Sequence, residues 1–166
     1  MDTEQNMPSV RLRTSVPEDA PSIASVLHES FIEYQSLYTP EGFAATTPAG
    51  EQIRERIKEG PVWVALQNDA IVGTVSVVPK GEALYIRGMA ILPSARGQRI
   101  GELLLSEIES FAVEQGLRRL FLSTTPFLGR AIRLYEHHGF TRSSEGPDNL
   151  AGTPLFTMEK ILETSS

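Results

Sequence analysis

The spacing of hydrophobic residues changes period several times along this chain of 166 residues. From Ser9 to Thr14, apolar and charged residues alternate, which predicts a strand with one face in solvent. From Pro17 to Tyr34 the spacing is helical, and the resulting apolar stripe is expected to pack on a core. That stripe consists of Ala20, Ile23, Ala24, Leu27 and Phe31.

The periodicity is lost from Gln35 to Gly50, so a long loop is expected there. Long loops in compact domains often line binding sites, which makes this segment a candidate substrate loop. A short helix is expected from Glu51 to Glu59, because Gly60-Pro61 would end it.

Three β-rich runs follow, from Val62 to Gln67, from Ala70 to Val78 and from Ala83 to Ile91. Asn68-Asp69 suits a tight hairpin turn between the first two runs, and Pro79 to Glu82 is expected to form the next turn. The three runs therefore predict an antiparallel meander.

The second half of the chain alternates helices and strands. Helical spacing from Glu102 predicts a helix that Gly116 can cap, and Leu117 to Thr124 is expected to return as a strand beside its predecessor. The remaining expected elements are a helix starting near Thr125-Pro126 and stopped by Gly139, a strand after Phe140 and a strand from Leu155 to Lys160.

Composition indicates one globular domain, because 40% of the residues are hydrophobic and 22% are charged. We expect a single domain over residues 1–166, with its core at about 9–161 and short flexible ends. The formal charge of -6 argues against an extended nucleic-acid surface, which needs many phosphate contacts. The absence of cysteine excludes disulfides and thiolate metal sites.

No membrane partner is expected, since no stretch approaches ~20 apolar residues and no basic segment precedes an apolar run at the N-terminus. The expected location is therefore the cytoplasm, as a monomer or a homodimer. No metal site is expected either. The adjacent His137 and His138 do not share a helix face, and no third ligand is spaced to join them.

The loop from Arg96 to Gly101 lies between a predicted strand and a predicted helix, and it carries the strongest chemical signal. Backbone N–H groups in the first turn of a helix lack partners and attract phosphate. Gly97 and Gly101 let the backbone approach an anion, while Arg96 and Arg99 add charged donors. The loop fits neither the P-loop nor the G-x-G-x-x-G pattern. It therefore predicts a different cradle for a pyrophosphate-bearing cofactor, with an ordinary turn carrying two exposed arginines as the alternative.

Two segments resemble motifs of the GCN5-related N-acetyltransferases. The segment from Met89 to Gly101 is similar to motif A, Q/R-x-x-G-x-G/A, with Arg96 in its first place and Arg99 where the middle glycine is usual. The segment from Ala131 to Phe140 is similar to motif B, A-x-x-L-Y-x-x-x-G-F. The motifs occur in the family's order, and the resemblance covers about residues 10–160.

The resemblance implies a mixed α/β fold with a twisted, mostly antiparallel sheet of about six to seven strands, splayed near Ile91 and flanked by helices on both faces. It also implies transfer of an acetyl group from acetyl-CoA to a primary amine of a small molecule or peptide, without a metal. Backbone near Met89 and Ile91 would bind pantetheine, and the loop would hold the pyrophosphate. The implied cofactor-binding residues are Met89, Ala90, Ile91, Arg96, Gly97, Gln98, Arg99, Ile100, Gly101 and Glu102.

Tyr135 is implied as the general acid that meets the departing thiolate. A phenol with a pKa near ~10 is a weaker acid than a thiol near ~8.5, so a hydrogen bond to the thiolate can suffice. The acceptor amine must lose its proton, and Glu82 is the leading candidate for the base, with Glu33 and His28 behind it. Charged residues at such positions are also ordinary surface residues.

Two positions depart from the family pattern. Ser123 stands where some relatives have a glutamate base, and Leu128 stands where an asparagine is often found. These departures make a noncatalytic CoA-binding or sensor module the alternative function. The acceptor site is defined only by Tyr34, Tyr38 and Phe43, which either form an aromatic wall or anchor the long loop to the core.

Overall fold

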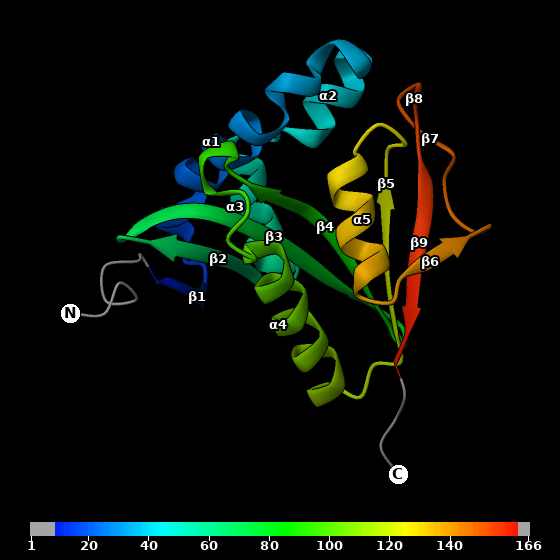
Figure 1. Cartoon of the computed structure of the whole chain (residues 1–166). Helices are drawn as coiled ribbons and strands as arrows, with labels where there is room; N and C mark the ends of the chain where they lie inside the picture. Colours follow the sequence, from blue (N-terminus) through cyan, green and yellow to red (C-terminus); the bar gives the residue numbers. More distant parts are fainter. Residues whose placement is uncertain (1–8, 163–166) are drawn as a thin grey trace.

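The computed structural model describes residues 9–162, which form a seven-stranded sheet between two layers of helices (Figure 1). The flexible ends expected from the sequence fall largely on residues 1–8 and 163–166, outside the described residues. The sheet has the order β1-β2-β3-β4-β5-β9-β6. Its strands are β1 (Val10–Thr14), β2 (Val62–Gln67), β3 (Ala70–Lys80), β4 (Ala83–Ile91), β5 (Arg119–Thr124), β6 (Thr141–Ser143) and β9 (Phe156–Ile161).

All neighbouring strands in this sheet are antiparallel except β4 and β5, which run parallel. A separate hairpin pairs β7 (Asn149–Leu150) with β8 (Thr153–Pro154). The predicted mixed fold and mostly antiparallel sheet are therefore confirmed. The expected meander is also confirmed, and the turn at Asn68 and Asp69 has positive φ angles of 52° and 63°, as a two-residue hairpin turn requires.

Helices cover both faces of the sheet (Figure 1). Val62 and Val64 on β2 pack with α1 and α3, whereas the alternate residues Trp63 and Ala65 face the cluster that includes α4 and α5. The helices are α1 (Ala20–Phe31), α2 (Pro40–Thr46), α3 (Gly50–Glu59), α4 (Ile100–Glu114) and α5 (Gly129–His137), with short 3-10 turns η2 (Pro17–Asp19), η3 (Ile32–Leu37) and η4 (Pro93–Ala95).

The segment from Gln35 to Gly50 is not the irregular loop that its lost periodicity predicted. It contains the end of η3 and the helix α2, which starts with Pro40 at its first position. Thr39 caps α2, because its Oγ1 accepts a hydrogen bond from the Gly42 N–H at 3.0 Å. Seven residues show too little of a helical period for α2 to be recognised. Elsewhere, α5 begins at Gly129 rather than at Thr125-Pro126.

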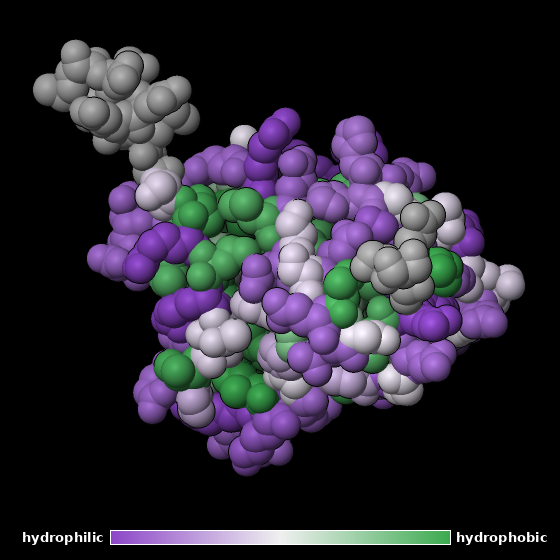
Figure 2. Space-filling view, turned by 90° about the horizontal axis from the view of Figure 1, so that it is seen from below, coloured by the Kyte–Doolittle hydropathy of each residue, from purple (hydrophilic) through white to green (hydrophobic). Residues whose placement is uncertain are grey.

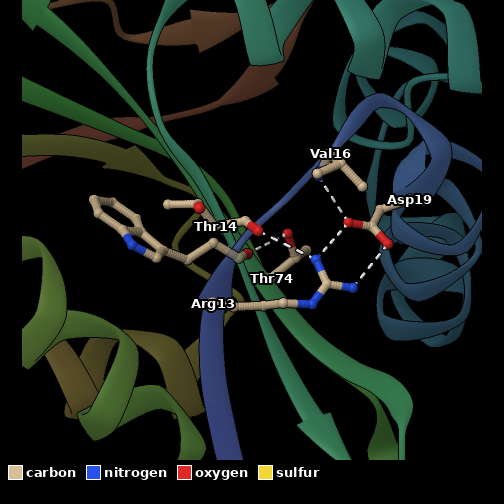
Figure 3. A network of polar contacts seen from close by, with 6 residues as sticks. Arg13, Thr14, Val16, Asp19 and Thr74 are labelled. Atoms are coloured by element: carbon tan, nitrogen blue, oxygen red, sulfur yellow. Dashed lines mark hydrogen bonds and ion pairs between the residues drawn. The ribbon is translucent and has the colours of Figure 1, made fainter.

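The corner between β1 and α1 is fixed by an ion pair between Arg13 and Asp19 (Figure 3). Arg13 donates to both Asp19 carboxylate oxygens, at 2.7 and 3.0 Å. Asp19 Oδ2 also accepts from the Val16 N–H at 2.9 Å, which satisfies a donor at the start of η2. These bonds set the direction in which α1 leaves the sheet.

The surface seen from below is mostly hydrophilic, with hydrophobic side chains gathered in separate places (Figure 2). Within residues 9–162, no helix is long and apolar enough to cross a membrane.

Candidate active site

The strands β4 and β5 separate partway along their length. They pair from Ala83 to Ile86 on β4, and in the described part of the chain this pairing ends beyond Ile86 while β4 continues to Ile91. A bulge in the β3–β4 pairing accompanies the change, and Gly88 within it has a φ of 63°. The two strands therefore diverge, as Figure 1 shows, and the expected splay near Ile91 is present.

A cavity of about 830 Å³ occupies this opening. One side is formed by the loop before α4 and by α5, and the other by the end of α1, η3, α2 and α3. Because α1 and α3 cover the opposite face of the sheet from α4 and α5, the cavity joins the two faces through the gap between β4 and β5.

The residues predicted to bind the cofactor come together along this cavity. All of them line it except Gln98, whose side chain accepts a hydrogen bond from the Gln67 amide instead. The loop reaches α4 through two left-handed residues, Gly97 with a φ of 83° and Arg99 with a φ of 63°. The N-terminus of α4 thus opens on the cavity, which is the arrangement that binds phosphate groups.

Gly101 lies at a close approach between the two predicted motifs. A Cβ at this position would lie 2.6 Å from Leu134 Cδ2 on α5 and 3.2 Å from Ile91 Cδ1 on β4. The absence of a side chain at this position leaves room for the ends of the Leu134 and Ile91 side chains, and β4, α4 and α5 together form one wall of the cavity.

Arg99 adopts a left-handed conformation that is costly for a residue with a Cβ. Its side chain is 83% exposed and its Nε lies 3.8 Å from Glu102 Oε2. Its backbone thus follows a path suited to glycine, while the guanidinium extends into solvent at the rim of the cavity.

Arg96 pairs with Glu33 and so joins the loop to η3 on the other side of the cavity. This pairing commits Glu33, the second candidate for the base, to a salt bridge. Among the described residues that line the cavity, Glu102 on α4 supplies the one carboxylate, and none is a histidine.

Tyr135 on α5 lines the cavity and is 7% exposed. Burial raises the pKa of its phenol well above the ordinary value near ~10, with a smaller contribution from Tyr38. Its hydroxyl makes no hydrogen bond with residues 9–162. The phenol therefore stays protonated and is available to donate to a group in the cavity.

Glu82, the leading candidate for the base, does not lie at the cavity. It is exposed in the turn before β4, where its carbonyl oxygen accepts from the Arg118 N–H at 2.8 Å. Since a strand rises about 3.3 Å per residue, Glu82 is roughly 25–30 Å from Ile91. His28 also lies outside the cavity, exposed on α1. The sequence indicated which residue types could act as a base, but it did not indicate which end of β4 borders the cavity.

The aromatic residues divide between the two roles that the sequence left open. Tyr34 and Tyr38 line the cavity, and Tyr38 packs edge-on against Phe127 at 4.9 Å. Phe43 is buried outside it, with its ring 5.9 Å from those of Tyr38 and His28. Phe43 therefore anchors α2, and the two tyrosines form the wall.

Three cavity-lining arginines were not assigned a site from the sequence, and one of them, Arg130, lies on α5. Arg56 on α3 was not identified, and Arg87 on β4 was left open between the acceptor and the cofactor. The signal for Arg56 is its position three residues after the buried Ile53, which places a charge within the apolar stripe of α3. Arg87 donates a hydrogen bond to Glu59, which lies on α3 with Arg56. The Arg87 side chain therefore lies on the face of the sheet that α1 and α3 cover.

Comparison with known proteins agrees with this geometry. The family described as "Acetyltransferase (GNAT) family" matches residues 24–140. The chain is 29% identical over 135 residues to an uncharacterized N-acetyltransferase, YjgM, of Escherichia coli, covering 78% of this chain and 80% of that protein. It is also 29% identical over 149 residues to an aminoalkylphosphonate N-acetyltransferase of Salmonella typhimurium, covering 84% of this chain and 90% of that protein.

A solved structure of the PaiA N-acetyltransferase from Thermoplasma acidophilum, in complex with coenzyme A, superposes with a TM-score of 0.80. It is 19% identical, and the match covers 93% of this chain and 99% of that one. At that identity the similarity shows a shared fold.

Proposed function

Because the chain belongs to the acetyltransferase (GNAT) family, we propose that it transfers the acetyl group of acetyl-CoA to a primary amine of a small molecule or peptide. The observation that carries the proposal is the cavity between β4 and β5. It brings the loop before α4, the end of β4 that does not pair with β5, and Tyr135 to one opening.

The residues on the α4 side fit the cosubstrate. The N–H groups of the first turn of α4, after Gly97 and Arg99, would hold the pyrophosphate, and the stretch from Met89 to Ile91 would bind pantetheine through its backbone. The small residue at Gly101 supports this fit, because a side chain there would displace the ends of the Leu134 and Ile91 side chains, which line the cavity.

Acetyl-CoA supplies a thioester whose carbonyl carbon a neutral amine can attack. The new C–N bond forms as the C–S bond breaks, while the amine loses a proton and the sulfur takes up negative charge or a proton. Backbone N–H groups near Ile91 would donate to the oxygen that becomes negative, and Tyr135 would donate to the sulfur. Positioning and these preorganised donors would provide most of the acceleration.

Tyr135 acts in this scheme as a hydrogen-bond donor more than as a strong acid. Its raised pKa makes full proton transfer less favourable than for a phenol in water. The same apolar surroundings also raise the pKa of the thiol, so the difference in pKa between the phenol and the thiol is partly cancelled. The acceptor amine would lose its proton to water, since Glu82 and His28 lie outside the cavity.

The alternative is a module that binds CoA without catalysis, which Ser123 and Leu128 favour because both depart from the pattern of active relatives. A thiol-release assay with acetyl-CoA and a panel of amines, run beside calorimetric titration with CoA, separates the two. Amine-dependent thiol release supports the enzyme. CoA binding with no turnover on any small amine or peptide supports the module, and failure to bind CoA contradicts both.

A further inference from the structure

The side of the cavity formed by α3 and β4 carries more positive charge than its neighbours neutralise. Arg56 and Arg87 both line the cavity there. Arg87 Nη2 donates to Glu59 Oε2 at 3.0 Å, whereas Arg56 forms no salt bridge with any carboxylate among residues 9–162. One half-exposed carboxylate therefore serves two guanidinium groups, in a chain whose net charge is -6.

The Arg56 guanidinium lies over the bulge in β4. A Cβ on Gly88 would be 2.9 Å from Arg56 Nη1, so the absence of a side chain at this position makes room for the guanidinium. Burial lowers the pKa of Arg56, and the charge of Arg87 lowers it further. A desolvated cation beside a like charge is unfavourable unless an anion offsets it.

Other polar groups along the cavity also lack partners. Ser30 Oγ and Thr124 Oγ1 belong to buried residues that line the cavity, and neither makes a hydrogen bond with residues 9–162. Arg87 Nε is buried and lacks a hydrogen-bond partner in the same part of the chain. Buried polar groups are ordinarily hydrogen-bonded, and the two hydroxyls can donate or accept. The Arg87 Nε–H can only donate, so it suits a ligand with acceptor oxygens.

We propose that Arg56 and Arg87 bind an oxyanion on the acceptor, which makes the acceptor a small primary amine that carries a carboxylate or phosphonate group. This inference rests on the proposed acetyl transfer and names its substrate class. The planar fork of an arginine matches both oxyanions through paired N–H donors. A protein or peptide amine without an acidic group nearby would bring only positive charge to a positive wall, which selects against it.

The two arginines act on binding and not on deprotonation of the amine. An amine attacks the thioester only when it is neutral, and the bound oxyanion offsets the positive charge that would otherwise lower the pKa of the ammonium group. Within residues 9–162 no carboxylate or imidazole lines the cavity outside the α4 side, so the acceptor would lose its proton to water.

The test compares acceptors with and without the acidic group: β-alanine with β-alaninamide, and aminomethylphosphonate with its diethyl ester. Because the members of each pair differ in amine pKa, kcat/KM is expressed per neutral amine. The acidic member of at least one pair should have the higher kcat/KM. Arg56→Gln should lower kcat/KM for that acid by roughly 10- to 100-fold, mainly through KM, and should change the value for the neutral partner by less than about twofold. Comparing the two acids shows whether the site prefers carboxylate or phosphonate.

Arg54→Gln is the matched control, because Arg54 is exposed on the same helix and does not line the cavity. This substitution should leave kcat/KM unchanged for both the acidic and the neutral acceptor. Arg56→Lys keeps the charge but loses the paired N–H donors of the guanidinium. Its kcat/KM for the acidic acceptor should therefore lie between those of the wild type and Arg56→Gln. Circular dichroism checks the fold of each variant, and the wild-type comparison of matched acceptors stands even where Arg56→Gln does not fold.

Equal or better acetylation of the neutral partners by the wild type would overturn the inference while leaving acetyl transfer intact. If no amine is acetylated, the proposed function fails. Calorimetric titration of the CoA-bound protein with β-alanine and aminomethylphosphonate then tests separately whether the oxyanion site exists. Binding that Arg56→Gln abolishes and Arg54→Gln preserves supports the site. Absence of binding, or binding indifferent to Arg56, contradicts it.

Discussion

Gly101 and Leu134 bring two distant segments of the chain into direct contact, since a Cβ on Gly101 would lie 2.6 Å from Leu134 Cδ2. The first residue begins α4 beside the anion-binding loop, and the second lies on α5 one residue before Tyr135. The side chain of Leu134, beside Tyr135, therefore packs into the space that a glycine leaves at the start of α4.

Gly101→Val should loosen this contact. The added side chain meets Leu134 and Ile91 inside a packed wall, and such overpacking costs about 1–3 kcal/mol. We expect a lower free energy of unfolding in urea and weaker CoA binding. Adding Leu134→Ala should restore part of the stability in a double-mutant cycle. Strictly additive effects of the two substitutions would contradict the contact.

Arg99→Gly should stabilise the protein by about 1 kcal/mol, because glycine adopts the left-handed conformation at position 99 without the steric cost that a Cβ adds. The lost contact with Glu102 is solvent-exposed and contributes little. CoA affinity should fall modestly, by the contribution of one exposed guanidinium. Chemical denaturation and calorimetric titration measure the two effects.

Arg99→Ala is the control for this substitution, since it removes the charge but keeps the left-handed strain. It should match Arg99→Gly in CoA affinity and the wild type in stability. A large loss of stability in Arg99→Gly would mean that the turn before α4 has another conformation.

The ion pair between Arg13 and Asp19 predicts a pH-dependent effect on stability (Figure 3). The hydrogen bond from Arg13 lowers the pKa of Asp19 below its ordinary value near ~3.9, although partial burial opposes the shift. The ionised carboxylate thus stabilises the fold above pH ~3.9, and the effect is lost as the pH falls through the lower folded-state pKa.

Asp19→Asn should therefore destabilise the protein by about 1 kcal/mol at neutral pH, and the difference should narrow at low pH. Thermal unfolding at several pH values measures this. Asp69→Asn serves as the comparison, because the Arg11–Asp69 pair is fully on the surface and should contribute almost nothing. A pH-independent difference for Asp19→Asn would rule out the linkage.

Local patterns predicted most of the strands and the loop that precedes α4. The alternation in β1, the turn at Asn68 and the glycines of the loop are properties of adjacent residues, and the structure has them in the expected places. The splay of the sheet at the end of β4 also followed from the motif resemblance.

The acceptor side could not be predicted in the same way, because distant segments form it. Arg56 on α3 and Arg87 on β4 line the same cavity, and no local spacing relates them. Glu82 was selected for its residue type, but it lies at the wrong end of a strand. α2 was missed because Phe43 and Thr39 hold it through tertiary contacts, the latter donating from its Oγ1 to the Ala151 carbonyl oxygen at 2.8 Å.

Tyr135→Phe should lower kcat by about 10²-fold and leave CoA affinity nearly unchanged, because it removes one donor to the sulfur and keeps the ring that packs 5.9 Å from Phe140. Tyr38→Phe is the comparison, since Tyr38 also lines the cavity with a pKa raised by burial. It should affect the acceptor KM more than kcat. Steady-state kinetics with saturating acetyl-CoA gives both values, and unchanged turnover in Tyr135→Phe would remove the tyrosine from the mechanism.

The pH profile of kcat provides an independent check on the same residue. The hydroxyl of Tyr135 must be protonated to donate, and burial raises its pKa above ~10, so its deprotonation cannot reduce the rate below that pH. The rate should instead rise with pH up to ~10 as more of the acceptor amine becomes neutral. A fall in kcat near pH ~9 that is absent from Tyr135→Phe would show that the phenol ionises more easily than its burial implies.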